Sequence, residues 1–447
     1  MITNFEPRQW QKVAFSQLKK SNFNAIVEAP TAAGKTVFGI MAISILRIRH
    51  PGLKTVIIVP TITLLRQWKH ELIKFLGLKE EDVGLYYGAK KDVSIGKKFM
   101  IYVINSAAKE KNLVNQQILN PFDFIIIDEV HHIGAISFAQ LLEINTFKYK
   151  LGISATPQRE YDGEGTKKIY DFFKEEIIVS PEYVERAPVT YNMIRVRLTS
   201  EEEKLYKSLQ KKSTICLSNL KKYYDLGKEK QLFFKRISEL AESGVEEAKA
   251  YISLLRRMEN IRFTARNKLK AIKNLAHKDL NKKTIIFCDR ISFVEEISET
   301  LKKCFPQREI YIIHSNLKKK EQKTQLQKFK SSNNSILVAA KIVDEGFDVP
   351  DASIGVFVSF TKSKRQSIQR DGRILRFLKN KIATKYIFVI KDIDEGDYCS
   401  ILIRTGQLNH ALNGAWIDFD NNQFSISSDF KTGFRLQYLT KTIKSEI

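Results

Sequence analysis

The chain has 447 residues, with 74 lysines and arginines against 50 aspartates and glutamates, a formal net charge of +24. This length predicts two or three domains, and this charge predicts a polyanionic partner. The composition argues against a disordered chain, since 43% of the residues are hydrophobic and no stretch is of low complexity.

Cysteine usage and apolar runs exclude further classes. The four cysteines, Cys216, Cys288, Cys304 and Cys399, form no Cys-x-x-Cys pair, which argues against a disulfide framework, a zinc site or an iron–sulfur cluster. The apolar stretch at residues 37–46 is about half a membrane span, and the first ten residues lack the apolar core of a signal peptide. We therefore expect a cytoplasmic or nucleoid protein with no membrane partner.

Near the N-terminus, residues 5–11 precede a short amphipathic helical pattern. Arg8 and Gln11 lie one helical turn apart and could together hydrogen-bond the edge of an adenine. A capped surface helix explains the same residues equally well.

Residues 29–36 read Ala-Pro-Thr-Ala-Ala-Gly-Lys-Thr between an apolar run and a helical pattern. A strand that turns sharply into a helix points backbone N–H groups and the positive end of the helix dipole at one spot, which suits an anion. In the P-loop pattern Lys35 reaches the outer phosphates and the Thr36 hydroxyl ligates magnesium. Ala29 and Ala32 stand where glycines are common, so an ordinary strand–turn–helix corner remains the alternative.

The next buried-type strands are predicted at residues 55–59, 100–104, 122–127 and 149–153. They end respectively in Pro60-Thr61, Asn105-Ser106, Asp128-Glu129 and Ser154-Ala155-Thr156. Strands that end in small or polar residues and alternate with helices predict a doubly wound parallel sheet, which binds ligands beyond the carboxyl ends of its strands.

Two adjacent acids after three isoleucines are a costly way to end a buried strand, because both charges need partners. Asp128 can hold the magnesium that bridges the β- and γ-phosphates, and Glu129 can activate the attacking water. A solvated strand end is the weaker alternative.

From residue 189 a strand-like pattern leads into a long, lysine-rich helical region that extends to residue 278. It carries Tyr223, Tyr224, Phe233 and Phe234. The region is either a solvated helical subdomain with aromatic core residues or an insertion that grips a phosphate backbone.

Five further strands, at 284–287, 310–313, 335–339, 354–358 and 386–390, predict a second sheet of similar plan. It has no Gly-Lys-Thr of its own. Arg373 and Arg376 lie one helical turn apart and could stabilise the charge that develops on a γ-phosphate, although an arginine pair alone is more often a surface patch. A hairpin is predicted around Asp420-Asn421-Asn422.

Taken in order, these motifs resemble those of a superfamily 2 helicase of the DExH type. The resemblance implies an ATP site built from the following residues: Arg8, Gln11, Ala32, Ala33, Gly34, Lys35, Thr36, Asp128, Glu129, Gly346, Asp348, Gln369, Arg373 and Arg376. It implies that His131, Ser154 and Thr156 link the nucleotide to strand movement. It assigns nucleic-acid contacts to Pro60, Thr61, Arg66, Asn105, Ser106, Arg159, Phe287 and Asp289.

Within that superfamily, Thr61-Ile-Thr-Leu-Leu-Arg-Gln-Trp68, Asp-Glu-Val-His-His and Gln-Arg-x-Gly-Arg-x-x-Arg are similar to the XPB (Rad25) and restriction-subunit group. The group carries a thumb where the helical insertion falls. The damage-recognition domain that precedes this core in XPB proteins is not part of the sequence, which weakens the expectation of a role in DNA repair.

We therefore expect an α/β protein of two tandem RecA-like, doubly wound parallel-sheet domains with a helical insertion. The predicted parts are residues 1–188 (first domain), 189–278 (insertion), 279–392 (second domain) and 393–447 (C-terminal extension). The predicted function is a helicase that uses ATP and Mg²⁺ on nucleic acid, DNA rather than RNA. The alternatives are a duplex translocase working with a nuclease or other accessory protein, and a nucleotide-gated scaffold without turnover.

Overall fold

The computed structural model describes residues 6–30, 33–109, 112–159, 162–179, 188–227, 230–340, 352–359, 383–394 and 414–426. These residues form two compact units, one up to residue 179 and the other from residue 188 onward. Within these ranges no helix combines the length and apolarity that a bilayer crossing requires.

The first unit contains an eight-stranded sheet in the order β4-β3-β5-β2-β6-β7-β1-β8, parallel except at the β3–β4 edge. Its strands are β1 (Asn24–Glu28), β2 (Thr55–Val59), β3 (Val83–Tyr87), β4 (Lys90–Lys91), β5 (Phe99–Val103), β6 (Phe124–Asp128), β7 (Tyr149–Ser154) and β8 (Glu176–Ile178). Its helices are α1 (Gln9–Lys20), α2 (Lys35–Arg49), α3 (Ile62–Leu76), α4 (Ile104–Ala108), α5 (Asn112–Leu119) and α6 (Gly163–Phe173).

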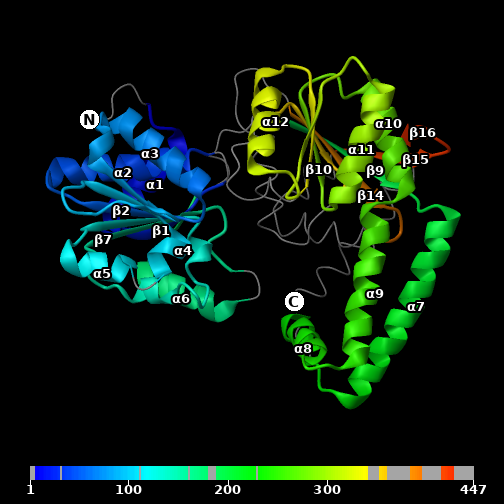
Figure 1. The fold of residues 1–447 in the computed structure, drawn as a ribbon, viewed down its shortest axis with the longest axis horizontal. Helices are drawn as coiled ribbons and strands as arrows, with labels where there is room; N and C mark the ends of the chain where they lie inside the picture. The colour runs from blue at the N-terminus through cyan, green and yellow to red at the C-terminus, as the bar shows by residue number, and fades with distance from the viewer. Residues whose placement is uncertain are drawn as a thin grey trace. The chain divides into compact units, whose positions relative to one another are not determined.

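Both faces of this sheet are covered, as its buried, apolar central strands require. Helices α1, α2 and α3 lie on one face and α4, α5 and α6 on the other (Figure 1). Alternate residues of one strand enter the two cores: Val27 packs in the α1–α3 core and Ile26 in the α4–α6 core.

The second unit has a sheet in the order β11-β12-β10-β13-β14-β9-β15-β16, parallel except for the final hairpin. Its strands are β9 (Val189–Val196), β10 (Thr284–Cys288), β11 (Ile310–Ile313), β12 (Ile336–Ala340), β13 (Ile354–Phe357), β14 (Ala383–Ile390), β15 (Ala415–Asp420) and β16 (Gln423–Ile426). Helices α11 (Ile291–Cys304) and α12 (Lys319–Ser331) cover opposite faces (Figure 1). The predicted fold of two α/β domains is confirmed, with both sheets mixed at one edge.

An arm of three helices extends from the second unit (Figure 1). Helix α7 (Ser200–Tyr223) begins at a capping box in which Thr199 and Glu202 each accept the other's backbone N–H, at 3.3 and 2.9 Å. Helices α8 (Lys230–Glu242) and α9 (Glu246–Phe263) complete the arm, and α10 (Arg266–Lys278) packs on the sheet. A small core around Leu220 and Ile237 holds the tip together.

The boundary of the predicted insertion differs from the structure. We expected residues 189–278 to be separate from the second sheet, whereas β9 pairs with β14 over eight positions, from Val189–Ala383 to Val196–Ile390. The C-terminal hairpin joins the same sheet, because β15 pairs with β9. Arg195 on β9 binds Asp418 on β15 through two hydrogen bonds of 2.7 Å. The described arm begins only at α7.

Candidate active site

The order of the strands in the first sheet brings the predicted motifs to one edge. Strands β5, β2, β6, β7 and β1 are consecutive neighbours and run parallel, so their carboxyl ends lie side by side. Along that edge the residues after the strands are Asn105, Thr61, Glu129, Thr156 and the loop that ends at Lys35. This is the edge at which doubly wound sheets bind their ligands.

The loop between β1 and α2 has the geometry of an anion site where it is described. Gly34 precedes α2 with φ of 92°, a left-handed conformation that favours glycine. Lys35 and Thr36 form the first turn of α2, where backbone N–H groups lack partners within the helix. Ala29 N–H donates to the Ser154 carbonyl at 2.9 Å and thereby ties the end of β1 to the end of β7.

Side chains at the start of helix α1 donate hydrogen bonds to backbone carbonyls of this loop. The Trp10 indole N–H donates to the Ala33 carbonyl at 2.9 Å, and the Arg8 guanidinium donates to the same oxygen at 3.2 Å. The Gln11 amide donates to the Gly34 carbonyl at 3.1 Å and accepts the Arg8 backbone N–H at 2.9 Å. A glutamine amide has two acceptor sites and two N–H donors. Gln11 uses one of each here, so one acceptor site and one donor remain for hydrogen bonds to an adenine.

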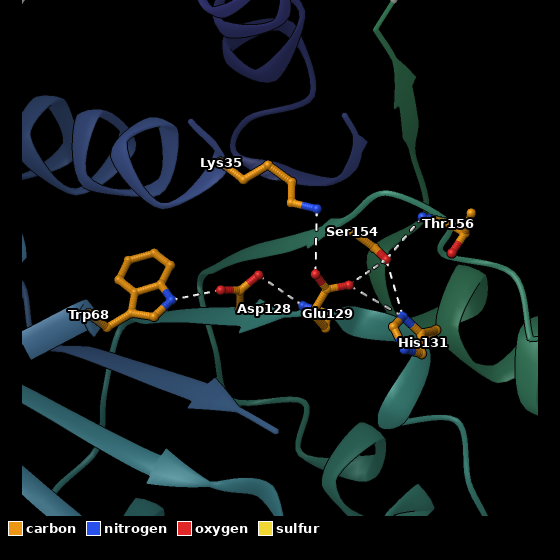
Figure 2. Close-up of polar contacts among 7 residues, drawn as sticks. All are labelled: Lys35, Trp68, Asp128, Glu129, His131, Ser154 and Thr156. Atoms are coloured by element: carbon orange, nitrogen blue, oxygen red, sulfur yellow. Dashed lines mark hydrogen bonds and ion pairs between the residues drawn. The ribbon is translucent and has the colours of Figure 1, made fainter. Parts of the chain in front are cut away.

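Asp128 is the last residue of β6 and lies almost fully buried beneath the edge. One carboxylate oxygen, Oδ2, accepts the Trp68 indole N–H at 2.8 Å, and Oδ1 accepts the Glu129 backbone N–H at 3.0 Å (Figure 2). Burial, and then the neighbouring charge of Glu129, raise the pKa of Asp128 to about 6, while Lys35 and the two hydrogen bonds act in the opposite direction.

Glu129 directs its carboxylate toward the loop lysine. Its backbone is left-handed, with φ of 50°, which is unusual for a residue other than glycine and typical of functional sites. Glu129 Oε1 lies 3.5 Å from Lys35 Nζ, and Oε2 lies 3.4 Å from the Ser154 hydroxyl, which donates to it (Figure 2). The ammonium group of Lys35 and the carboxylates of Glu129 and Asp128 therefore lie close together at the strand ends.

A chain of polar contacts connects Glu129 with His131, Ser154 and Thr156, the residues predicted to link the nucleotide to movement of the nucleic-acid strand. The buried His131 places Nδ1 at 3.2 Å from the Ser154 hydroxyl oxygen, which also accepts the Thr156 backbone N–H at 3.2 Å (Figure 2). Arg159 donates to the His131 carbonyl at 2.6 Å and binds Asp162 at 2.7 Å. Arg159, predicted to contact nucleic acid, is therefore engaged in bracing this chain of contacts.

The side chains at this point suit a magnesium nucleotide. Lys35 Nζ is buried and donates no hydrogen bond within the described ranges, which fits a cation whose partner is a phosphate oxygen. A carboxylate and the Thr36 hydroxyl are oxygen ligands of the kind that Mg²⁺ binds together with phosphates. The donor set of Lys35, Thr36 and Asp128 is therefore of the kind that a nucleotide and its metal ion would need.

The residues predicted to contact nucleic acid differ in exposure. Thr61 caps α3, accepting the Leu64 N–H at 3.3 Å, and Arg66 is exposed one turn further on. Asn105 is exposed and Ser106 half-buried at the neighbouring strand end. Phe287, in contrast, is 1% exposed and stacks on Phe357, so its side chain belongs to the core of the second unit.

Of the four aromatic residues noted in the arm, Phe233 packs against the tip core, while Tyr223, Tyr224 and Phe234 are exposed. The packing of Phe233 fits the interpretation of these aromatic residues as core, whereas the grip on a phosphate backbone stays a prediction. Asp289 lies half-buried after β10. Several predicted site residues lie outside the described residues: Ala32, Gly346, Asp348, Gln369, Arg373 and Arg376.

Trp10 and Trp68 are not among the site residues predicted from the sequence. Both side chains are fully buried. The available signal was chemical, since a buried tryptophan normally finds an acceptor for its indole N–H. Here the acceptors are the Ala33 carbonyl and the Asp128 carboxylate.

Comparison with known proteins agrees with this geometry. Residues 4–159 match the family described as type III restriction enzyme, res subunit, and residues 267–378 match the helicase conserved C-terminal domain. The helicase domain of Hef from Pyrococcus furiosus has the same fold, with a TM-score of 0.60 at 20% identity over 89% of this chain and 99% of that one. The chain is therefore similar to the superfamily 2 helicases over both of its sheets.

Within that superfamily the chain is similar to proteins of the XPB (Rad25) group. It is 28% identical to the DNA 3'-5' translocase XPB2 of Sulfurisphaera tokodaii over 83% of this chain and 79% of that protein. It is 23% identical to the DNA 3'-5' helicase XPB of Mycobacterium tuberculosis over 82% of this chain, but spans only 58% of that relative. These similarities indicate that the chain is of the class of ATP-dependent helicases and translocases, which act on nucleic acid.

Proposed function

We propose that the first unit binds Mg-ATP at Lys35, Thr36 and Asp128 and that Glu129 activates the attacking water. The observation that carries this proposal is the 3.5 Å approach of Lys35 to Glu129 beside the buried Asp128. Magnesium, when bound, neutralises charge on the phosphates. Lys35 holds the outer phosphates, and Glu129 takes the proton of a water that its Oε atoms orient.

The test is Glu129→Gln, which keeps the shape of the side chain and removes its basicity. We expect ATP binding within about twofold of the parent and turnover reduced by about 10²–10⁴-fold, the usual contribution of a general base. Glu143→Gln, an exposed glutamate in the same unit, is the control for loss of a carboxylate elsewhere in the unit. Normal hydrolysis by Glu129→Gln would remove Glu129 from the mechanism.

We infer that the nucleic acid is DNA and that ATP hydrolysis drives 3'-5' movement along one strand. The two XPB relatives, named a DNA 3'-5' translocase and a DNA 3'-5' helicase, support both points. The strand ends beside Thr61 and Asn105, together with exposed Arg66, offer polar contacts of the kind that hold a backbone without reading sequence. A net charge of +24 favours such a partner.

The affinity for a single strand is expected to fall steeply as salt rises, because released counterions drive phosphate binding. Titration of labelled DNA and RNA strands of one sequence at several salt concentrations measures this slope and the preference together. A slope near zero, or tighter binding of RNA, would contradict this part of the proposal.

Movement along a duplex without strand separation is the second candidate. It is favoured by the name of the Sulfurisphaera relative, a translocase, and by the match of residues 4–159 to a restriction-enzyme subunit family. In such a role the motor works with a nuclease or another accessory protein inside the cell. A translocase displaces a triplex-forming strand but leaves a forked duplex intact, whereas a helicase separates the fork, so the two assays run side by side discriminate.

A further inference from the structure

Trp68 lies on helix α3 and contacts the carboxylate of Asp128. Its side chain is fully buried, and its indole N–H donates to Asp128 Oδ2 at 2.8 Å (Figure 2). The other oxygen, Oδ1, accepts the Glu129 backbone N–H at 3.0 Å. With one donor on each oxygen, the carboxylate cannot rotate without breaking a hydrogen bond.

Helix α2 packs against the indole ring of Trp68. Gly39 lies one turn after Lys35, and a Cβ atom built there would stand 2.6 Å from the Trp68 ring carbon Cη2. Only a glycine lets α2 approach the ring so closely. Leu65 and Leu72, on the same face of α3 as Trp68, are also fully buried. The ring is thus held between the helix that follows the phosphate loop and the strand that ends in Asp128.

Helix α3 connects this junction with the strand end proposed to meet nucleic acid. The helix begins at Ile62, directly after the Thr61 cap, and carries the exposed Arg66 two residues before Trp68. A helix is stiff over one or two turns, so a displacement of its first turn moves the indole and pulls on the hydrogen bond to Asp128. The link is short and purely local to the first unit.

We propose that Trp68 is a positioning residue, which fixes the Asp128 carboxylate for the metal of the nucleotide and ties that position to helix α3. The inference rests on the proposed function, since it needs Asp128 to face Mg-ATP. Groups that orient a metal ligand without touching the metal are a general feature of metal sites. An indole N–H suits this position because it is a donor only and cannot compete for the metal.

Trp68→Phe tests the proposal, because it removes the donor and keeps an aromatic ring. We expect the Mg²⁺ concentration for half-maximal ATP hydrolysis to rise by about 10-fold, within the usual range for loss of such a supporting group. Binding of a fluorescent ATP analogue in EDTA should stay within about twofold of the parent, while the gain on adding Mg²⁺ should shrink by a similar factor of about 10. Trp416→Phe, the same exchange at a buried site of the second unit, is the matched control and should leave both unchanged.

Gly39→Ala is the second variant, because it keeps the tryptophan and pushes its ring. It should raise the Mg²⁺ requirement in the same direction, and it decides the question if Trp68→Phe does not fold. In both variants the ratio of ATP hydrolysis with and without DNA should fall, since helix α3 no longer controls the carboxylate.

An unchanged Mg²⁺ requirement in both variants would overturn the positioning role, and an unchanged DNA stimulation ratio would overturn the link to α3. Failure of this inference is distinguishable from failure of the proposed function. If Glu129→Gln abolishes turnover while Trp68→Phe behaves as the parent, only the inference is wrong. If the parent protein itself hydrolyses no ATP, the proposed function fails first.

Discussion

The buried carboxylate of Asp128 is expected to make the nucleotide-free protein less stable at neutral pH. Burial raises the pKa of this carboxyl from 3.8 to about 6 in the folded protein. The folded state therefore holds its proton more tightly than the unfolded state does. Stability then falls as pH rises from about 4 to about 6, and the loss of about 3 kcal/mol persists above that range, at 1.36 kcal/mol per unit of pKa.

Asp128→Asn removes the charge and keeps an acceptor for the Trp68 N–H. The asparagine NH₂ group cannot accept the Glu129 backbone N–H, which costs about 1 kcal/mol. We therefore expect the variant to be more stable than the parent by about 2 kcal/mol at pH 8, and the advantage to shrink by about 1 kcal/mol at pH 5. The same variant should lose ATP hydrolysis, so that stability and activity change in opposite directions.

The assay is urea unfolding in EDTA without nucleotide, at pH 5 and pH 8. A Trp416→Phe background confines tryptophan fluorescence to Trp10 and Trp68, which both lie in the first unit. Glu143→Gln again provides the control for loss of one carboxylate in this unit. A variant that is destabilised equally at both pH values would refute the reasoning, because it would show that Asp128 is not ionised at a cost in the folded protein.

Two further predictions concern contacts in each unit. Gln11→Ala removes the hydrogen bond to the Gly34 carbonyl and should raise the KM for ATP more than the KM for GTP if Gln11 reads adenine; equal increases would restrict its role to shaping the loop. Arg195→Met leaves the carboxylate of Asp418 without its bidentate partner and should destabilise the second unit by about 3 kcal/mol in urea unfolding. Arg197→Met, which breaks an exposed pair with Asp420, should cost less than about 1 kcal/mol, and similar losses in both would contradict the argument.

Much of the fold could be predicted because its strands are short, β-branched and buried on both faces. The run at residues 55–59 coincides with β2, and the run at 310–313 with β11. The run at 55–59 is followed directly by Pro60-Thr61, one of the motifs predicted at the strand ends. The two helicase domains and their class were therefore accessible from residues alone.

The strands that were missed or misplaced owe their structure to distant partners. β8, with three residues, is too short for a pattern and exists through its pairing with β1. β9 precedes a helical region in the sequence, and its membership of the second sheet depends on pairing with β14, whose residues lie nearly two hundred positions later. Local periodicity carries no information about such partners.

The same limit applies to the candidate site. Lys35, Asp128 and Glu129 could be named because each belongs to a short motif with its own chemistry. The hydrogen bond between Trp68 and Asp128 joins residues 60 positions apart, and the left-handed backbone of Glu129 is a conformation that its residue type disfavours. Both follow from packing at the sheet edge, which the sequence does not display.

The route of the chain through the second sheet has a practical consequence for engineering the arm. The segment before the arm is anchored through β9, and the segment after it through α10 and β10, in one continuous hydrophobic core. The tip loop at residues 243–244, between α8 and α9, is exposed and lies outside the small core there. A chain divided at that tip would yield two fragments that each supply neighbouring strands of one sheet, so the tip is the natural point for fragment complementation or for inserting a reporter domain.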